Sequence, residues 1–294
     1  MTSQPLADQE AQTGVDLQRR FGGLARLYGA AGAKAIARAH VVVVGIGGVG
    51  SWAVEALARS GVAGLTLIDL DHIAESNVNR QVHALSSTLG QAKVQAMRER
   101  IEQIHPACEV RCIEDFVTEH NWPALAGLEV GGEQTLAVID CCDQVSAKLA
   151  MAAWSLATRS IFVSVGAAGG KRQAHRVDLA DLAEVTHDPL LAQVRYRLRR
   201  QHGAPRDKKI GLSCVFSREA VLKPPLQSVP EPVPEPVLEP VLDSGLQCEG
   251  ASAAAHDSSL NCHGYGSVVS VTSTFGLCAA GWVLDQLAAR AEAA

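Results

Sequence analysis

The sequence predicts an α/β fold, in which helices cover both faces of a doubly wound, mostly parallel β-sheet. Two observations support this prediction. Short apolar runs rich in β-branched residues alternate with longer segments rich in Ala, Leu, Gln and Glu. With 294 residues, 47% of them hydrophobic, the chain is also long enough to bury both faces of such a sheet. Parallel strands joined through helices form right-handed crossovers, as in doubly wound domains.

Five apolar runs in the first half are expected to form the strands of this sheet. They lie at 40–44, 64–69, 109–113, 135–140 and 160–165. Helices are expected between the strands, at 49–60, 91–105 and 145–158. The continuous apolar character of most of these runs is typical of strands that are buried on both faces.

The second half is less regular, and we interpret it as a C-terminal extension of the same domain. Residues 173–179 are expected to continue the sheet, and 189–201 and 268–291 to form helices. No Asp, Glu, Lys or Arg occurs from 258 to 284. Because Ser, Thr, Gly, Asn and His dilute that run, we expect a helix buried in the protein or at a subunit interface. A membrane contact is the alternative.

The segment 223–242 interrupts this extension with a near-repeat of Glu-Pro-Val, in which Glu231, Glu235 and Glu239 each precede a proline. Proline removes amide donors and disfavours helices and central strands. We interpret the segment as part of a flexible insertion over 223–258, either inert or a docking motif. A single domain is therefore expected over 18–294, after a flexible N-terminus at 1–17.

The composition excludes some classes of protein. The chain carries 26 Lys and Arg against 31 Asp and Glu, which argues against a uniformly basic nucleic-acid binder. The first residues lack the apolar core of a secretory signal, so a cytoplasmic location is expected. None of the 8 cysteines forms a C-x-x-C pair, so we expect no structural zinc. Cys214 and Cys262 are interpreted as structural, with reactive thiols as the alternative, and His83, His175 and His187 as structural.

A glycine-rich loop follows the first expected strand. Residues 45–50 read Gly-Ile-Gly-Gly-Val-Gly and match G-x-G-x-x-G directly before an expected helix. Such glycines allow a tight turn and let backbone amides approach phosphate at the helix N-terminus. Asp69 ends the next strand, at the spacing of a ribose-binding carboxylate. The first half is therefore predicted to be Rossmann-like, and this pattern alone most often indicates NAD or FAD.

Charged side chains further along the sequence favour ATP instead. Asp140 ends an expected strand, and Arg80, Lys93 and Asp143 follow expected strands. In open α/β sheets the carboxyl ends of the strands bind ligands. Arg80 and Lys93 can neutralise a triphosphate, and Asp143 can hold Mg²⁺. Taken singly, the cations could be solvated charges and the aspartates could be caps of helices or turns. Their order after a glycine loop favours an ATP-binding half.

In combination these motifs resemble the ThiF/MoeB superfamily of ATP-dependent adenylating enzymes. The motifs that carry the resemblance lie at 45–50, 67–71, 76–81, 90–93 and 140–143. Further motifs, at 20–29, 83–85, 115–118, 188–190 and 214–217, are similar to the tRNA threonylcarbamoyladenosine dehydratase branch. The similarity covers about 18–222 and resumes at 262–284, whereas the segment 223–242 is not typical of the family.

The resemblance implies that ATP adenylates the carboxylate of threonylcarbamoyladenosine in tRNA, and that the activated group then cyclises with loss of water. Gly48 is implied to contact phosphate and Asp69 ribose. Arg80 and Lys93 are implied to hold the phosphate chain, and Asp143, supported by Asp140, to bind Mg²⁺. The full implied nucleotide-binding set is Gly45, Gly47, Gly48, Gly50, Asp69, Asp71, Ser76, Asn77, Asn79, Arg80, Gln81, Lys93, Asp140 and Asp143.

A homodimer is also implied by the resemblance. In the superfamily an N-terminal arginine can reach across a dimer to the phosphates, and Arg20 and Arg26 are the candidates here. The implied catalytic residues are Arg80, Lys93, Asp143 and Arg26. Cysteine desulfurases and sulfur acceptors are candidate partners.

A basic cluster on this acidic chain is the expected tRNA-binding surface. Its residues are Lys171, Arg172, Arg195, Arg199, Arg200, Lys208 and Lys209. Arg and Lys at this density suit contacts to RNA phosphates. A solvated helix face with internal ion pairs is the alternative.

Three other functions stay open at this point. An adenylyltransferase could activate the C-terminus of a ubiquitin-like sulfur-carrier protein. An NAD-binding oxidoreductase could transfer hydride without Mg²⁺. A non-catalytic module could bind ATP without turnover.

Overall fold

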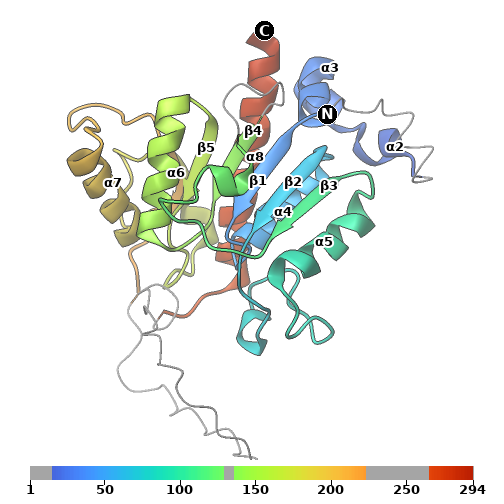
Figure 1. Cartoon of the computed structure of the whole chain (residues 1–294), viewed down its shortest axis with the longest axis horizontal. Helices are drawn as coiled ribbons and strands as arrows, with labels where there is room; N and C mark the ends of the chain where they lie inside the picture. Colours follow the sequence, from blue (N-terminus) through green and yellow to red (C-terminus); the bar gives the residue numbers. More distant parts are fainter. Residues whose placement is uncertain (1–14, 129–135, 223–264, 294) are drawn as a thin grey trace, which may run out of the picture.

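The computed structural model describes residues 15–128, 136–222 and 265–293. A seven-stranded sheet with strand order β3-β2-β1-β4-β5-β7-β6 forms its centre (Figure 1). The strands are β1 (His40–Val44), β2 (Gly64–Ile68), β3 (Glu109–Ile113), β4 (Leu136–Asp140), β5 (Ile161–Val165), β6 (Val177–Asp181) and β7 (Ser213–Ser217). Neighbouring strands are parallel except β6 and β7, which pair antiparallel. The predicted α/β class and mostly parallel, doubly wound sheet are confirmed.

The strand order reverses beside β1. The chain first builds outward through β2 to β3 and then returns to place β4 on the other side of β1. In register, Val44 pairs with Ile68 on one side and with Asp140 on the other. The carboxyl ends of β1, β2 and β4 therefore meet at one edge of the sheet, where open α/β sheets bind ligands.

Alternating residues of each central strand face two separate cores. Val41 and Val43 belong to one core, and Val42 and Val44 belong to the other. The first core is covered by α3 (Leu24–Ile36), α4 (Gly50–Arg59), α5 (Lys93–Ile104) and α8 (Val269–Ala293). The second is covered by α6 (Val145–Thr158) and α7 (Pro189–Gln201). This two-sided burial explains why the strands are apolar runs rather than alternating patterns.

The charge-poor run near the C-terminus forms α8, which packs against α3 and α4. At Gly276 a Cβ atom would clash with the backbone of α4 at Val49, so glycine is needed for this close approach. The prediction of a buried helix is confirmed for the described part of the run. Across the three described ranges, no helix is long and apolar enough to cross a membrane.

Some elements differ from the predictions. The strand expected at 173–179 begins only at Val177, because Ala174–Arg176 form a short 3-10 turn. β7 is not apparent from the sequence, because serines flank its short buried apolar centre. Helices α2 (Leu17–Phe21) and α3 are not apparent either. The Pro- and Glu-rich segment, Cys262 and residues 1–14 lie outside the described residues.

Candidate functional site

A cavity of about 730 Å³ opens at the carboxyl ends of β1, β2, β4 and β5. Most of the predicted nucleotide-binding residues line it. These are Gly45, Gly47, Gly48, Asp69, Asp71, Ser76, Asn77, Asn79, Arg80, Gln81, Lys93 and Asp143. They come from segments that are far apart in the sequence, and the parallel sheet brings these segments to one edge.

The glycine loop joins β1 to α4, and its first and last glycines stand where a side chain would be strained or would clash. Gly45 has a φ of 85°, in the region that disfavours other residues. At Gly50 a Cβ atom would clash with the Gly45 carbonyl, so Gly50 shapes the turn but does not line the cavity. At Gly48 a Cβ atom would lie 3.2 Å from the Arg80 side chain. The loop therefore presents bare backbone beside the aliphatic part of the Arg80 side chain, and such backbone suits phosphate binding.

Asp69, Asp71 and Lys93 form a charged cluster on the β2 side of the cavity. The Asp69 carboxylate accepts hydrogen bonds from the amides of Ile46 at 2.6 Å and Asp71 at 2.9 Å, which ties the glycine loop to the end of β2. Lys93 Nζ lies 2.5 Å from Asp71 Oδ2 and 3.9 Å from Asp69 Oδ1. Burial raises the pKa of Asp69, and the nearby Lys93 ammonium counteracts part of this effect. An ammonium at this place can serve phosphate oxygens.

Arg80 lies in the loop between β2 and α5. Its Nη1 donates to the Ser76 carbonyl at 2.5 Å and to Asn79 Oδ1 at 3.0 Å. The Trp52 indole on α4 donates to the Arg80 carbonyl at 2.9 Å. The Asn79 side chain donates to the Ser267 carbonyl, just before α8, at 3.1 Å. The loop is therefore anchored from two sides, with Arg80 in the cavity wall.

The two aspartates after β4 occupy different environments. Asp143 lines the cavity, whereas Asp140 does not. Asp140 is fully buried, and its carboxylate accepts from Lys148 Nζ at 3.0 Å and from Ser164 Oγ at 2.6 Å. The placement of Asp140 among nucleotide-contacting residues is therefore corrected, because a carboxylate enclosed by protein donors cannot reach a ligand.

The two N-terminal arginines are not among the residues that line the cavity. Arg26 is exposed on α3. Arg20, on α2, donates to the Ile104 carbonyl at the end of α5 at 2.6 Å. A role for either residue across a dimer stays a prediction.

The basic residues expected to bind tRNA divide into two groups. Arg172, Arg200, Lys208 and Lys209 are exposed. The guanidinium groups of Arg195 and Arg199 donate to backbone carbonyls next to α7, which restrains them. The exposed side chains are thus the ones that can meet an RNA backbone.

Lys171 does not belong to this surface. It is 1% exposed, and its Nζ donates to the carbonyls of His187 at 3.2 Å and Glu219 at 3.1 Å. Burial lowers the pKa of Lys171, although nearby carboxylates oppose that shift. The prediction that Lys171 contacts tRNA is wrong, because the ammonium group is enclosed by the protein.

Cys214 and the three histidines that were interpreted as structural differ in their burial. Cys214 on β7 is buried, and burial raises the pKa of its thiol well above the ordinary value. A reactive thiol needs the opposite shift. His83 is buried, while His175 and His187 are exposed. In the part of the chain that the structure describes, no three His, Cys, Asp or Glu side chains are grouped to hold a metal ion.

Part of the cavity wall comes from residues outside the predicted nucleotide-binding set. Phe116 follows β3, the turn 166–169 follows β5, and Tyr265 and Thr272 lie before and within α8. Phe116 lies in the motif 115–118, and the turn is rich in glycine, so both carry a local signal. Tyr265 and Thr272 lie in the segment 262–284, where the family similarity resumes, but only the packing of α8 against α4 shows that this segment reaches the cavity.

The sequence is similar to those of known proteins over nearly its whole length. The model of the ThiF family matches residues 19–292. The tRNA threonylcarbamoyladenosine dehydratase of Escherichia coli (strain K12) is 39% identical over 277 residues, which cover 93% of this chain and 95% of that protein. The protein of the same name from Haemophilus influenzae is 36% identical over 273 residues, which cover 92% of this chain and 94% of that protein.

Solved structures share the fold. The crystal structure of E. coli tRNA N6-threonylcarbamoyladenosine dehydratase, TcdA, in complex with AMP has a TM-score of 0.76 at 38% identity, covering 94% of this chain and 97% of that chain. The structure in complex with ATP has a TM-score of 0.75 at 36% identity, covering 94% and 96%. Motifs, fold and relatives agree that this chain belongs to the ThiF family and, within it, to the tRNA threonylcarbamoyladenosine dehydratases.

Proposed function

We propose that this chain is an ATP-dependent dehydratase that acts on threonylcarbamoyladenosine in tRNA. The observation that carries the proposal is the cavity at the reversal of strand order, whose wall contains the glycine loop, Arg80, Lys93 and Asp143 together. Family membership supports it, since relatives bear the name of this activity and two related structures are complexes with AMP and ATP.

The residues of the cavity fit an adenine nucleotide. The backbone of the glycine loop and the start of α4 favour an anion, and Arg80 and Lys93 add two cations. Asp69 closes β2 at the position that suits a ribose hydroxyl. A volume of about 730 Å³ is within the range of small-molecule sites and leaves room for a second group beside the nucleotide.

The chemistry needs alignment rather than a nucleophile from the protein. A carboxylate oxygen of the modified nucleoside attacks the α-phosphorus of ATP, the bond from that phosphorus to the β-phosphate breaks, and pyrophosphate leaves. A nucleophilic atom of the same nucleoside side chain then attacks the carboxyl carbon. AMP leaves with the former carboxylate oxygen, and one proton is released. The nucleoside loses one water overall, and Arg80 and Lys93 stabilise the charge on the phosphates.

Asp143 is the residue that would hold Mg²⁺. Proteins commonly bind this ion through one or two carboxylates together with substrate phosphates, which matches one carboxylate beside a phosphate-binding loop. When bound, the ion neutralises phosphate charge. Arg80 and Lys93 then orient the phosphate chain toward the attacking carboxylate.

We place the tRNA against α7 and the segment that follows it. The exposed basic residues there are Arg197, Arg200, Arg206, Lys208 and Lys209. Tyr196 is 61% exposed, and its hydroxyl accepts from Arg200 Nη1 at 3.3 Å, so an aromatic ring lies among the cations. Leu190, in the first turn of α7, lines the cavity, and the basic residues follow along the helix and beyond it, towards the start of β7. The homodimer, partners in sulfur transfer and the cytoplasmic location stay predictions.

The test uses purified protein, ATP, Mg²⁺ and tRNA that carries threonylcarbamoyladenosine. The tRNA is digested after the reaction, and its nucleosides are weighed by mass spectrometry. An ATP-dependent loss of one water from the modified nucleoside is the expected result. An unchanged nucleoside, under conditions in which the protein binds ATP, contradicts the proposal and favours activation of a ubiquitin-like sulfur carrier.

A further inference from the structure

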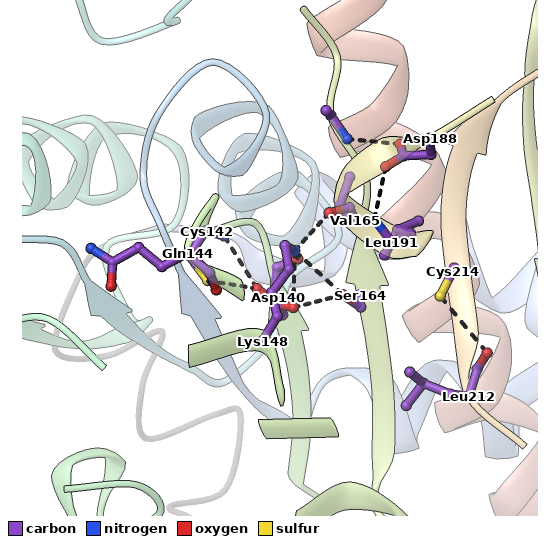
Figure 2. Close-up of polar contacts among 11 residues, drawn as sticks. Asp140, Cys142, Gln144, Lys148, Ser164, Val165, Asp188, Leu191, Leu212 and Cys214 are labelled. Atoms are coloured by element: carbon purple, nitrogen blue, oxygen red, sulfur yellow. Dashed lines mark hydrogen bonds and ion pairs between the residues drawn. The ribbon is translucent and has the colours of Figure 1, made fainter. Parts of the chain in front are cut away.

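A buried ion pair lies next to the cavity without lining it. Lys148, on α6, and Asp140, at the end of β4, have side chains that are 0% exposed, and Lys148 Nζ lies 3.0 Å from Asp140 Oδ2 (Figure 2). Taking two charges out of water is costly, and apolar residues of similar size are often as stabilising. Stability alone therefore gives little reason for the pair.

Lys148 ties the end of β4 to the end of β5. Its Nζ donates to the Val165 carbonyl at 2.7 Å and to Ser164 Oγ at 3.3 Å, both on β5. Figure 2 shows the ammonium group among these oxygens. Burial is the largest influence and lowers the pKa of Lys148, but the charge and hydrogen bond of Asp140 and the nearby cysteine thiols together raise the pKa above its ordinary value. The turn 166–169, which lines the cavity, begins directly after Val165.

The second oxygen of Asp140 extends the network to the loop of Asp143. Asp140 Oδ1 accepts from the Cys142 amide at 3.2 Å and from the Cys142 thiol at 3.0 Å (Figure 2). Cys142 directly precedes Asp143, and both residues line the cavity. Lys148 is therefore connected, through one carboxylate, to the loop that carries the proposed Mg²⁺ ligand.

A second buried carboxylate holds the turn after β5 from the other side. Asp188, the N-cap of α7, accepts from the Leu191 amide at 2.9 Å and from the Ala167 amide at 2.9 Å (Figure 2). A Cβ atom at Gly166 would clash with the Asp188 carboxylate, so the turn lies tightly against it. The turn is thus held between Lys148 and the start of the helix that we place against tRNA.

We propose that Lys148 is a positioning residue for the reaction: it sets the Asp143 loop through Asp140 and the turn 166–169 through Val165. The two loops then keep the separation that attack of the nucleoside carboxylate on ATP needs. This inference rests on the proposed function for its consequence, whereas the bonds themselves are present in the structure. A misplacement of about 1 Å can cost on the order of 100-fold in rate, so such a constraint has a measurable effect.

The test compares the double variant Asp140→Asn/Lys148→Met with Met151→Ala. The double variant removes both charges together, so no uncompensated charge is left buried, and Asn keeps an oxygen for the Cys142 amide. Met151 is fully buried one turn further along α6, and none of the hydrogen bonds or ion pairs described above involves its side chain. Ser164→Ala removes one bond from each member of the pair and replaces the double variant if that does not fold.

Hydrogen exchange of the amides at 142–144 and 166–169 in nucleotide-free protein measures the positioning directly. Rates with ATP, the KM for ATP and the Mg²⁺ concentration for half-maximal rate measure its consequence. We expect faster exchange in both loops, a kcat lower by about 10- to 100-fold, a smaller change in KM and a higher Mg²⁺ requirement in the double variant. Ser164→Ala is expected to shift the same quantities less.

Met151→Ala is expected to lower Tm while loop exchange and kcat stay near wild type. Wild-type exchange and kcat in the folded double variant would overturn the proposal. An equal loss of kcat in Met151→Ala at a temperature where both variants are folded would overturn it as well. Absence of dehydratase activity in the wild-type protein would instead remove the proposed function, because loop exchange is measured without substrate.

Discussion

Two aspartate–lysine pairs lie after the two strands that flank β1, and they differ in access to the cavity. Lys93 and Asp71, after β2, both line the cavity, and the Asp71 side chain is 59% exposed. Lys148 and Asp140, after and at the end of β4, are 0% exposed. The chemical groups are the same. The first pair can take a phosphate as a further partner, whereas protein oxygens already surround the second.

Asp140, at the end of β4, and Asp69, directly after β2, stand one residue apart in register, but register alone does not separate a buried from a cavity-lining carboxylate. Asp140 is the last residue of β4 and pairs with Val44, at the level where Ile68 stands in β2. Asp69 comes one residue beyond Ile68, and it lines the cavity. Val44 and Ile68, at the level of Asp140, line the cavity as well, so the enclosing donors Lys148 and Ser164 make Asp140 an internal anchor.

The largest expected effect comes from breaking the buried pair on one side only. Lys148→Met leaves the Asp140 carboxylate buried without its cation, so the free energy of unfolding is expected to decrease by about 3–5 kcal/mol. Lys93→Met leaves Asp71 with access to water but also removes a cation 3.9 Å from the buried Asp69, so its expected loss is smaller, about 1–2 kcal/mol. Denaturant unfolding of both variants measures the difference. Equal losses of stability would contradict the comparison.

The second-largest effect is expected at Asp143, which lines the cavity. Asp143→Ala is expected to lower the ATP-dependent rate by on the order of 10²–10³-fold, the scale found when one group that stabilises transition-state charge is removed. The Tm is expected to change little, because the residue belongs to a loop in the cavity wall. Normal Mg²⁺-dependent activity in this variant would refute the assignment of Asp143.

The third effect is a pH dependence of stability that arises from His83, a buried histidine near Lys93. His83 is 2% exposed, and burial, assisted by the charge of Lys93, lowers its pKa to about 4. The unfolded chain binds a proton near pH 6.5 and the folded protein does not, so stability falls as the pH decreases from about 6.5 to about 4, by at most roughly 3 kcal/mol.

His83→Leu is expected to flatten this part of the pH profile of unfolding. The control is His120→Gln, since the His120 side chain is 88% exposed. If both variants keep the wild-type slope, His83 is not the group responsible.

The smallest effect concerns the surface of α7. Arg200→Ala is expected to weaken tRNA binding modestly and to reduce the slope of log affinity against log salt by about 1, as for the loss of one phosphate contact. Lys34→Ala, at an exposed site on α3, serves as the control. Binding is measured at several salt concentrations, and identical slopes for the two variants would argue against tRNA on α7.

Much of the fold and the site could be predicted from local features of the sequence. The strands β1, β2, β4 and β5 have continuous apolar runs and β3 alternates, and the glycine loop places glycine where the turn needs a positive φ or has no room for a side chain. β7 could not be recognised, because its serines break the apolar run and only its neighbours β5 and β6 make it a buried strand. Tyr265 and Thr272 reach the cavity solely through the packing of α8.

The sequence by itself determined the parallel sheet, the turn that can approach phosphate and the charges at the strand ends, because periodicity, glycine conformation and motif spacing are local properties. Only the tertiary structure decided which charges line the cavity. Lys171 was expected at the surface, but its ammonium group is enclosed by the carbonyls of His187 and Glu219. Asp140 was expected in the nucleotide site, but its carboxylate is paired with the buried Lys148. Burial depends on segments that are distant in the chain, and no local pattern records it.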